Sequence, residues 1–119
     1  MGPEAQFRAH LAEGRFMIQR SASTGRHVFY PRGAVPGTGE QDLEWVEASG
    51  EGVVYSTTVN RRSPEKGGTF NIALIDLAEG PRMMSRVTDI APEDVAIGMA
   101  VTAYVGELNG EICILWRPK

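Results

Sequence analysis

Residues 19–44, QRSASTGRHVFYPRGAVPGTGEQDLE, contain two short turns that decide the fold of the N-terminal third of the chain. The turns 21–24 and 35–38 have the x-x spacing at which a zinc ribbon places Cys-x-x-Cys, and a glycine that tolerates positive φ follows each turn. The four ligand positions hold Ser21, Thr24, Val35 and Thr38, side chains that cannot hold zinc in a structural site. The stretch therefore predicts a ribbon-like hairpin with no zinc and no other cofactor.

Length and composition predict a small globular protein. The chain has 119 residues and is 42% hydrophobic, enough for a core, and its net charge of -3 argues against duplex nucleic acid as the main partner. The single cysteine excludes an internal disulfide, and no apolar run approaches the roughly 18 residues of a membrane span. The chain start lacks the pattern of a secretory signal, so we expect a cytoplasmic protein without a membrane partner.

Charge is distributed unevenly along the N-terminal part. Arg15, Arg20, Arg26 and Arg32 form a basic run without an acidic residue between them, whereas residues 40–51 carry five carboxylates and no base. Two interpretations are open for the basic run. In the first, the arginine side chains are simply exposed to water on the outside of the hairpin, and in the second they bind an anion such as a phosphate.

The first residues predict a short amphipathic helix. Gly2-Pro3-Glu4 is typical of a helix start, Gly14 of a helix end, and Phe7 and Leu11 fall on one face. About three turns are marginal in isolation, so the helix is expected to dock on the protein's own core or on a partner.

The strand pattern predicts a five-stranded OB-fold barrel at residues 43–119, after a helix and ribbon at residues 1–42. The first strand is long and is bent at Ser49-Gly-Glu-Gly52, a short helical turn begins at Pro92, and Asn109-Gly110 marks a tight hairpin. Residues 61–68 form a polar loop between the first two strands. The two ribbon strands are expected at 15–20 and 26–30, and the five barrel strands at 43–59, 69–77, 82–87, 100–105 and 112–116.

No catalytic constellation is visible. His10 and His27 are the histidines of the chain, and no local spacing gives either of them a nucleophile. Cys113 lies between apolar neighbours and is expected to be a buried, inert thiol. Trp45, at the entry to the barrel, and Trp116 are expected to pack in the core. We therefore expect no catalytic residue and no enzymatic activity of the isolated chain.

Several of these pieces together resemble a known family. LEWVEASGEGVVYSTTV (43–59), ALIDLAEGPRMMSRV (73–87) and PEDVAIGMAV (92–101), behind an empty ribbon that contains Tyr30-Pro-Arg32, resemble the acyl-CoA-associated OB-fold family with a rubredoxin-like zinc ribbon, known as domain of unknown function thirty-five. The most specific pieces are Leu43-Glu-Trp45 with Ser49-Gly-Glu-Gly52, and Asp76-Leu-x-Glu-Gly-Pro-Arg82. The resemblance extends over nearly the whole chain.

The resemblance implies an accessory or bridging subunit that binds acyl-CoA, a thiolase-like or hydratase-like enzyme of acyl-CoA metabolism, or both. It implies no catalytic residue for the module itself. The family's two Cys-x-x-Cys pairs fall on the four positions that lack cysteine here. The candidate CoA- or partner-binding residues are Arg15, Arg20, Arg26, Arg32, Arg61 and Arg62.

Two other classes of function are less favoured. A single-stranded nucleic-acid-binding barrel needs a basic face with stacking aromatic side chains, but the middle strands offer Phe70 followed by Met83 and Met84, and the chain is net acidic from Val46 onward. A small hydratase or thioesterase that acts alone needs a nucleophile and base pair that the sequence does not supply.

Overall fold

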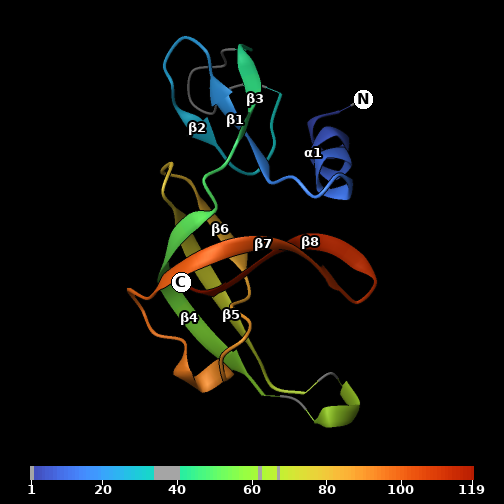
Figure 1. Cartoon of the computed structure of the whole chain (residues 1–119), viewed down its shortest axis with the longest axis vertical. Coiled ribbons are helices and arrows are strands. Elements are labelled where there is room, and N and C mark those ends of the chain that lie inside the picture. The colour runs from blue at the N-terminus through green and yellow to red at the C-terminus, as the bar shows by residue number, and fades with distance from the viewer. Residues whose placement is uncertain (1, 34–40, 62, 67) are drawn as a thin grey trace.

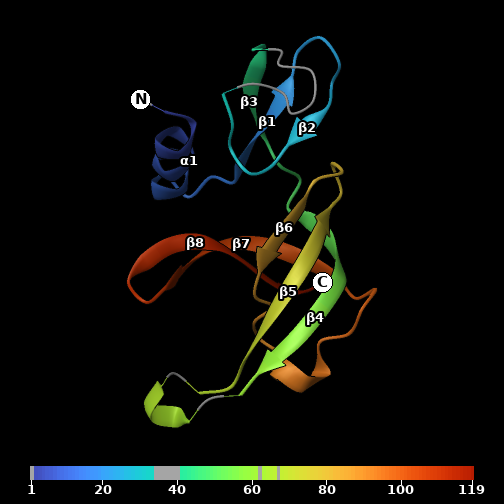
Figure 2. The same ribbon diagram turned by 180° about the vertical axis from the view of Figure 1, so that it is seen from behind.

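The chain forms a helix and two β-sheets that lie end to end, as a computed structural model shows from two opposite sides in Figures 1 and 2. The structure describes residues 2–33, 41–61, 63–66 and 68–119, and the molecule measures 46 × 29 × 23 Å. In chain order the elements are α1 (Pro3–Ala12), β1 (Met17–Ser21), β2 (His27–Val28), β3 (Leu43–Glu47), β4 (Glu51–Asn60), the 3-10 turn Pro64–Lys66, β5 (Phe70–Leu77), β6 (Arg82–Ser85), the 3-10 turn Pro92–Asp94, β7 (Ala100–Leu108) and β8 (Glu111–Pro118). The prediction of a mainly β protein with an N-terminal helix is confirmed.

The small sheet has the strand order β2-β1-β3 and forms the ribbon module. Strand β1 pairs with β3 along its whole length, from Met17 opposite Glu47 to Ser21 opposite Leu43. Our expectation that Leu43 begins the first barrel strand is therefore wrong, because residues 43–47 pair within the ribbon. Alternation of apolar and polar residues predicts a strand at 43–47, but it does not say which strand becomes its partner.

The large sheet is antiparallel, has the order β6-β5-β4-β7-β8 and curls into a half-barrel. A parallel bridge between Val87, which follows β6, and Trp116 in β8 joins the two ends of the curled sheet. The backbone N–H of Trp116 donates to the Arg86 carbonyl at 3.0 Å. The five strands and the helical turn between the third and fourth confirm the predicted OB-type order. Asn109 and Gly110 both have positive φ, 53° and 84°, as the predicted tight hairpin requires.

The core lies inside the curled sheet. Val54, Ile75, Val101 and Trp116 are each at most 1% exposed, so the expectation for Trp116 is confirmed. Asn71 is also buried, and its amide exchanges two hydrogen bonds with the backbone of Val87, at 2.7 and 2.9 Å. This side chain acts as a strand partner at the point where the sheet closes on itself.

A hinge of three residues joins the two sheets between β3 and β4. Gly50 has a φ of +79°, and a Cβ on Gly52 would lie 2.7 Å from Cγ2 of Ile75 and 3.0 Å from the Trp116 ring. The glycines that predicted a bend therefore serve two purposes. Gly50 turns the chain, and Gly52 lets β4 approach the core closely.

Helix α1 packs on the protein itself, over the small sheet and β8. Leu11 is buried in the common core, and Phe7 packs against it from the same helical face. Trp45 donates its indole N–H to Gln6 Oε1 at 2.8 Å, and its ring lies 5.2 Å from that of His10. Trp45 thus fastens α1 to the ribbon, whereas we expected it in the barrel core. Within the described residues, no helix has the length and apolar character needed to cross a membrane.

Candidate functional site

Hydrogen bonds from Ser21 and Ser23 to the Asp42 carboxylate hold the turn 21–24 against the residue that precedes β3, and we call this group of three residues the clasp. The Ser21 hydroxyl is fully buried and lies 3.0 and 3.1 Å from the two Asp42 carboxylate oxygens. The Ser23 backbone N–H donates to Asp42 Oδ2 at 2.7 Å, and the Thr24 N–H lies 3.3 Å from Ser21 Oγ. Hydrogen bonds from Ser23, and then from Ser21, lower the pKa of Asp42 below its usual value. Ser21 therefore joins the turn 21–24 to the start of β3.

Sequence reasoning missed Asp42 because its partners lie 19 and 21 residues away. Val35 and Thr38, which stand where a zinc ribbon would have its second Cys-x-x-Cys pair, lie outside the described residues. The expectation that they leave the second turn without zinc stays a prediction. Thr24 accepts a hydrogen bond from the Arg26 N–H at 3.2 Å and so closes the first turn. In the described part of the chain, no group of three or more His, Cys, Asp or Glu side chains is arranged to hold a metal ion.

The basic run divides into two pairs of arginines. Arg20 forms an ion pair with Glu44 at 2.8 Å, and Arg15 approaches Glu47 at 3.9 Å, so the acidic run of β3 lies beside the basic run of β1. Arg26 and Arg32 instead lie on the barrel side of the ribbon, where both line one small cleft. These two arginines are therefore brought together, and Arg15 and Arg20 are not part of the same site.

The loop arginines lie apart from the ribbon. Arg61 forms an exposed ion pair with Glu93 at 3.3 Å, beside the 3-10 turn Pro92–Asp94. Figure 1 shows the C-terminal end of β4, which ends at Asn60, and the 3-10 turn Pro64–Lys66 at the end of the molecule opposite the ribbon. Arg61 follows β4 directly and so does not share a site with Arg26 and Arg32. Arg62 lies outside the described residues.

The histidines and the cysteine do not form a catalytic pair in the described structure. His10 lies against Trp45, and its Nδ1 is 3.9 Å from Glu13. His27 lies in β2, opposite Arg20. Burial raises the pKa of the Cys113 thiol, and although nearby Arg86 acts in the opposite direction, the net shift is upward. The raised pKa favours the thiol over the thiolate at neutral pH. The expectation of a buried side chain is met only in part, because Cys113 is half-buried at the edge of the barrel.

The two most specific pieces of the sequence meet at the hinge. Glu79, in the turn between β5 and β6, accepts a hydrogen bond from the Ser49 backbone N–H at 2.6 Å. The Ala78 N–H donates to the Glu51 carbonyl at 2.9 Å, and β4 and β5 pair from Gly52 and Leu77 onward. Ser49-Gly-Glu-Gly52 and Asp76-Leu-x-Glu-Gly-Pro-Arg82 thus fix the ribbon relative to the barrel. Their contacts are structural: Glu79 binds the hinge backbone, Asp76 pairs with Arg82, and Glu51 pairs with Lys119.

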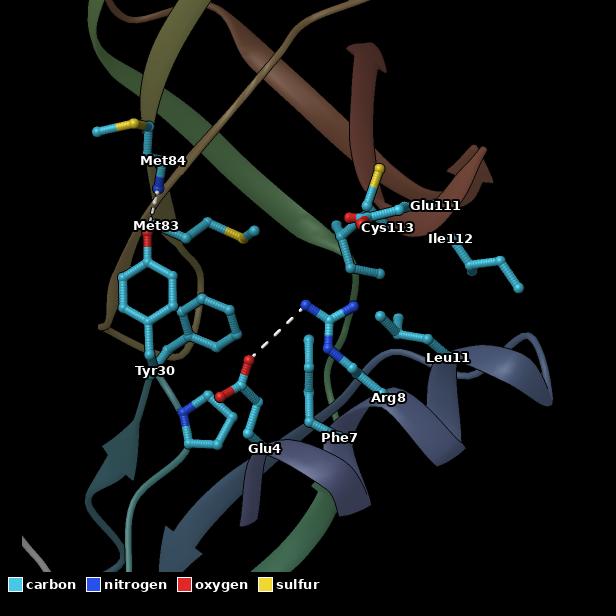
Figure 3. A pocket seen from close by; sticks show the side chains of 13 residues that line it. Glu4, Phe7, Arg8, Leu11, Tyr30, Met83, Met84, Glu111, Ile112 and Cys113 are labelled. Carbon is cyan, nitrogen blue, oxygen red and sulfur yellow. Dashed lines mark hydrogen bonds and ion pairs between the residues drawn. The ribbon is translucent and has the colours of Figure 1, made fainter. Parts of the chain in front are cut away.

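One open cleft, which we call the seam cleft, has a volume of about 440 Å³ and lies between β6, β8, α1 and the segment 29–31 of the ribbon (Figure 3). In the described part of the chain β6 and β8 form no ladder with each other, so the barrel is open here. Figure 3 shows Arg8 reaching from α1 into the middle of the cleft toward Glu4, with which it forms an ion pair at 3.7 Å. The lining residues are Glu4, Phe7, Arg8, Leu11, Phe29, Tyr30, Pro31, Met83, Met84, Glu111, Ile112, Cys113 and Ile114.

The rim of the seam cleft is apolar and exposed. Met84, Tyr30 and Ile112 are 58%, 49% and 43% exposed, and they come from β6, the ribbon and β8. The Tyr30 hydroxyl accepts a hydrogen bond from the Met84 N–H at 3.1 Å, which ties the ribbon to the edge strand of the barrel. Large apolar side chains gathered around one opening are typical of an interaction site rather than of free surface. Sequence reasoning missed this cleft because its walls come from four segments that are distant in sequence.

Comparisons with known proteins agree with this architecture. The family model described as "ChsH2, C-terminal OB-fold domain" matches residues 45–106. A DUF35 domain-containing scaffold protein of Pyrococcus furiosus is 30% identical over 116 residues, which cover 92% of this chain and 85% of that protein. The solved structure titled "Ltp2-ChsH2(DUF35) aldolase" superimposes with a TM-score of 0.84 at 30% identity and covers 98% of this chain and 94% of the matched chain.

A longer relative also matches. The probable enoyl-CoA hydratase alpha subunit of Thermomonospora curvata is 36% identical over 109 residues, which are 87% of this chain and 34% of that subunit. The chain therefore spans about a third of the hydratase subunit. Because the barrel model covers residues 45–106 and the scaffold protein matches along most of its length, the chain belongs to the DUF35 family of OB-fold proteins.

Proposed function

We propose that this protein is a non-catalytic accessory subunit that binds an enzyme of acyl-CoA metabolism through the rim of the seam cleft. The observation that carries the proposal is the exposed apolar rim formed by Met84, Tyr30 and Ile112 around an opening in the barrel. Helix, ribbon and barrel each contribute to this face, so a partner seated there would contact all three (Figure 3). The names of the relatives support the class of partner, because they include a scaffold protein and a hydratase subunit.

The chemistry of the described residues supports a role without catalysis. Cys113 is among the residues that line the seam cleft, but the pKa of its thiol is raised, and neither histidine lines that cleft. The charged groups in the cleft are an arginine, Arg8, and two glutamates, Glu4 and Glu111. General acid and base chemistry on an acyl-CoA would therefore come from the partner enzyme, which is either thiolase-like or hydratase-like.

The ribbon is proposed to fold without zinc. The Ser21 and Asp42 clasp supports this view, because it connects the first knuckle to β3 at the place where a metal would otherwise hold the hairpin. No other cofactor is proposed. The ribbon would then serve as a docking element, with Tyr30 and Pro31 on the rim of the cleft.

Single-stranded nucleic acid is the less favoured partner. Phe70, the aromatic side chain that the alternative relies on, already carries the Arg86 guanidinium 3.9 Å from its ring centroid. Met83 is buried, so it offers no surface for a base to stack on. Tight and strongly salt-dependent retention of an oligonucleotide in a filter-binding assay would reverse this ranking.

Co-expression tests the docking surface. The chain is produced together with a thiolase-like or a hydratase-like enzyme of acyl-CoA metabolism, and the complex is sought by size-exclusion chromatography. We expect co-elution of the wild type and its loss in Met84→Asp, because a carboxylate in an apolar interface is left desolvated. Val53→Asp is the matched control, since Val53 is similarly exposed, at 45%, but lies on β4 away from the cleft. Loss of the complex in both variants, or in neither, would contradict the proposed surface.

A further inference from the structure

We infer that the edge of β8 beside the seam cleft accepts an extended segment of the partner enzyme whose side chains are alternately apolar and acidic. The segment would add a strand to the large sheet in the gap between β8 and β6. That the segment belongs to an acyl-CoA enzyme rests on the proposed function, whereas the strand-binding edge rests on the geometry of the gap.

The edge of β8 that faces the gap has backbone groups without a partner among the described residues. The Trp116 N–H points away from β7, because it donates to the Arg86 carbonyl. In an antiparallel pair this direction repeats every second residue, so the backbone groups of Ile114 and Ile112 point the same way. The Ile114 carbonyl accepts from Ser85 Oγ at 2.9 Å, but no other described residue bonds to the Ile114 N–H or the Ile112 backbone. Such an edge is a template for another strand.

The facing edge of β6 is less available. The Met84 N–H already donates to the Tyr30 hydroxyl at 3.1 Å. Strands β6 and β8 both run toward the parallel bridge between Val87 and Trp116, so the gap is closed at the bridge and open on the side where the two strands begin. An incoming strand would therefore pair with β8.

The gap has a cleft on each face of the sheet. The seam cleft lies on the face that carries the core residue Met83, together with Ile112. A second cleft of about 410 Å³, which we call the outer cleft, is lined by Arg86 and Leu115, which point to the opposite face. Ile114 lines both clefts, so they lie on the two sides of one gap. Because successive side chains of a strand point to opposite faces, an inserted strand would fill the two clefts alternately.

The outer cleft favours an acidic side chain. The Arg86 guanidinium lies 3.9 Å from the centroid of the Phe70 ring, and in this position the N–H groups at the edge of its plane can still bind a carboxylate. Arg82 and Arg117 also lie over aromatic rings, and each pairs with an aspartate. No carboxylate is among the described residues that line the outer cleft, so an acidic side chain of the partner would supply the counter-charge.

NMR titration of the full chain with three synthetic peptides tests the edge and the charge separately. The peptides are VEVEVE, VKVKVK and a form of VEVEVE in which every backbone nitrogen is methylated, all with capped ends. We expect VEVEVE to shift the amide resonances of Ile112 and Ile114 and to bind about tenfold more tightly than VKVKVK, which cannot form a charge-assisted hydrogen bond with Arg86. The methylated peptide should not bind, because it has no N–H to donate to β8.

Two pairs of variants assign the effects to residues. Arg86→Gln should abolish the preference for VEVEVE. Arg117→Gln is its matched control, because the Arg117 guanidinium also lies over a ring, at 4.0 Å from the Tyr104 centroid, but does not line the outer cleft. Ile112→Pro removes the edge N–H and should abolish binding, whereas Ile112→Ala keeps the N–H and should bind. Circular dichroism should show that every variant is folded.

Equal affinities for VEVEVE and VKVKVK, binding of the methylated peptide, or no binding of any peptide would overturn the strand-binding edge. Co-elution with the enzyme, and its loss in Met84→Asp, would then still support the proposed function. Binding of VEVEVE at β8 by a chain that forms no complex with the enzyme would support the edge and count against the proposed function.

Discussion

The ribbon and the barrel of this protein are stabilised in different ways. The barrel surrounds an apolar core in which Val54, Ile75 and Trp116 are almost completely buried. The small sheet has one short strand, His27–Val28, and its turn is held by polar contacts between Ser21, Ser23 and Asp42. We propose that hydrogen bonds and the docked helix supply part of the stability that a structural metal would otherwise give such a module. The difference can be tested by changing each region separately.

The largest effect is expected from Trp116→Ala in the barrel. The indole is fully buried and packs edge-to-face on Phe16 with ring centroids 6.3 Å apart, so its removal leaves a large cavity in the core. We expect the free energy of unfolding to fall by about 3–5 kcal/mol, measured by chemical denaturation. Trp45→Ala is the matched variant in the ribbon. It should cost less and should release α1, and an equal cost for both would contradict the contrast between the two modules.

A smaller loss is expected from Gly52→Ala at the hinge. The added methyl group would lie 2.7 Å from Ile75 Cγ2, and the β4 and β5 backbones leave little room to move. Overpacking of this kind costs about 1–3 kcal/mol. Gly33→Ala is the control, since a Cβ at that position meets nothing within 4 Å. Thermal unfolding that is unchanged by Gly52→Ala would show that the close approach at the hinge is not rigid.

Ser21→Ala should weaken the ribbon and leave the barrel intact. Loss of one buried hydrogen-bonding hydroxyl costs about 1 kcal/mol. Amide hydrogen exchange should therefore accelerate in β1 and β2 but not in β5, with Ser63→Ala in the polar loop as the control. Uniform acceleration through both sheets would mean that the clasp supports the whole molecule.

The smallest effect concerns the pH dependence of the clasp. The pKa of Asp42 is lowered in the folded protein, so its stabilising contribution is fully present above the unfolded-state pKa of about 4 and is lost as the pH falls through the lower folded-state value. Titration of the Ser23 amide resonance by NMR should show this transition below pH 4. Asp42→Asn should remove the transition. A transition at or above the ordinary carboxyl value would contradict the hydrogen-bond geometry.

Local signals in the sequence predicted much of the fold. The helix, the bend at Gly50 and the hairpin at Asn109-Gly110 each depend on residues that are close in sequence, and each prediction is confirmed. The assignment of Leu43 to the barrel was wrong, because a strand pattern does not identify the partner strand. This error concerns which strand residues 43–47 pair with, and not whether they form a strand.

The candidate site was harder to predict because it depends on long-range contacts. The acidic run opposite the basic run neutralises Arg20 through Glu44, a contact across 24 residues that neither run reveals alone. The exposed rim joins Tyr30, Met84 and Ile112 from three segments, and none of them stands out in its own stretch. Arg26 and Arg32, by contrast, were already among the predicted residues, and the fold brings their side chains to one cleft.

Native mass spectrometry of the chain co-expressed with a thiolase-like or hydratase-like enzyme of acyl-CoA metabolism tests the proposed docking role most directly. A single spectrum reports both the assembly and the mass of every bound metal. We predict a heteromeric complex in which this chain has the mass of the polypeptide alone and from which Met84→Asp dissociates. A chain that remains separate from the enzyme, or that carries one zinc ion, would contradict the view of a metal-free docking subunit.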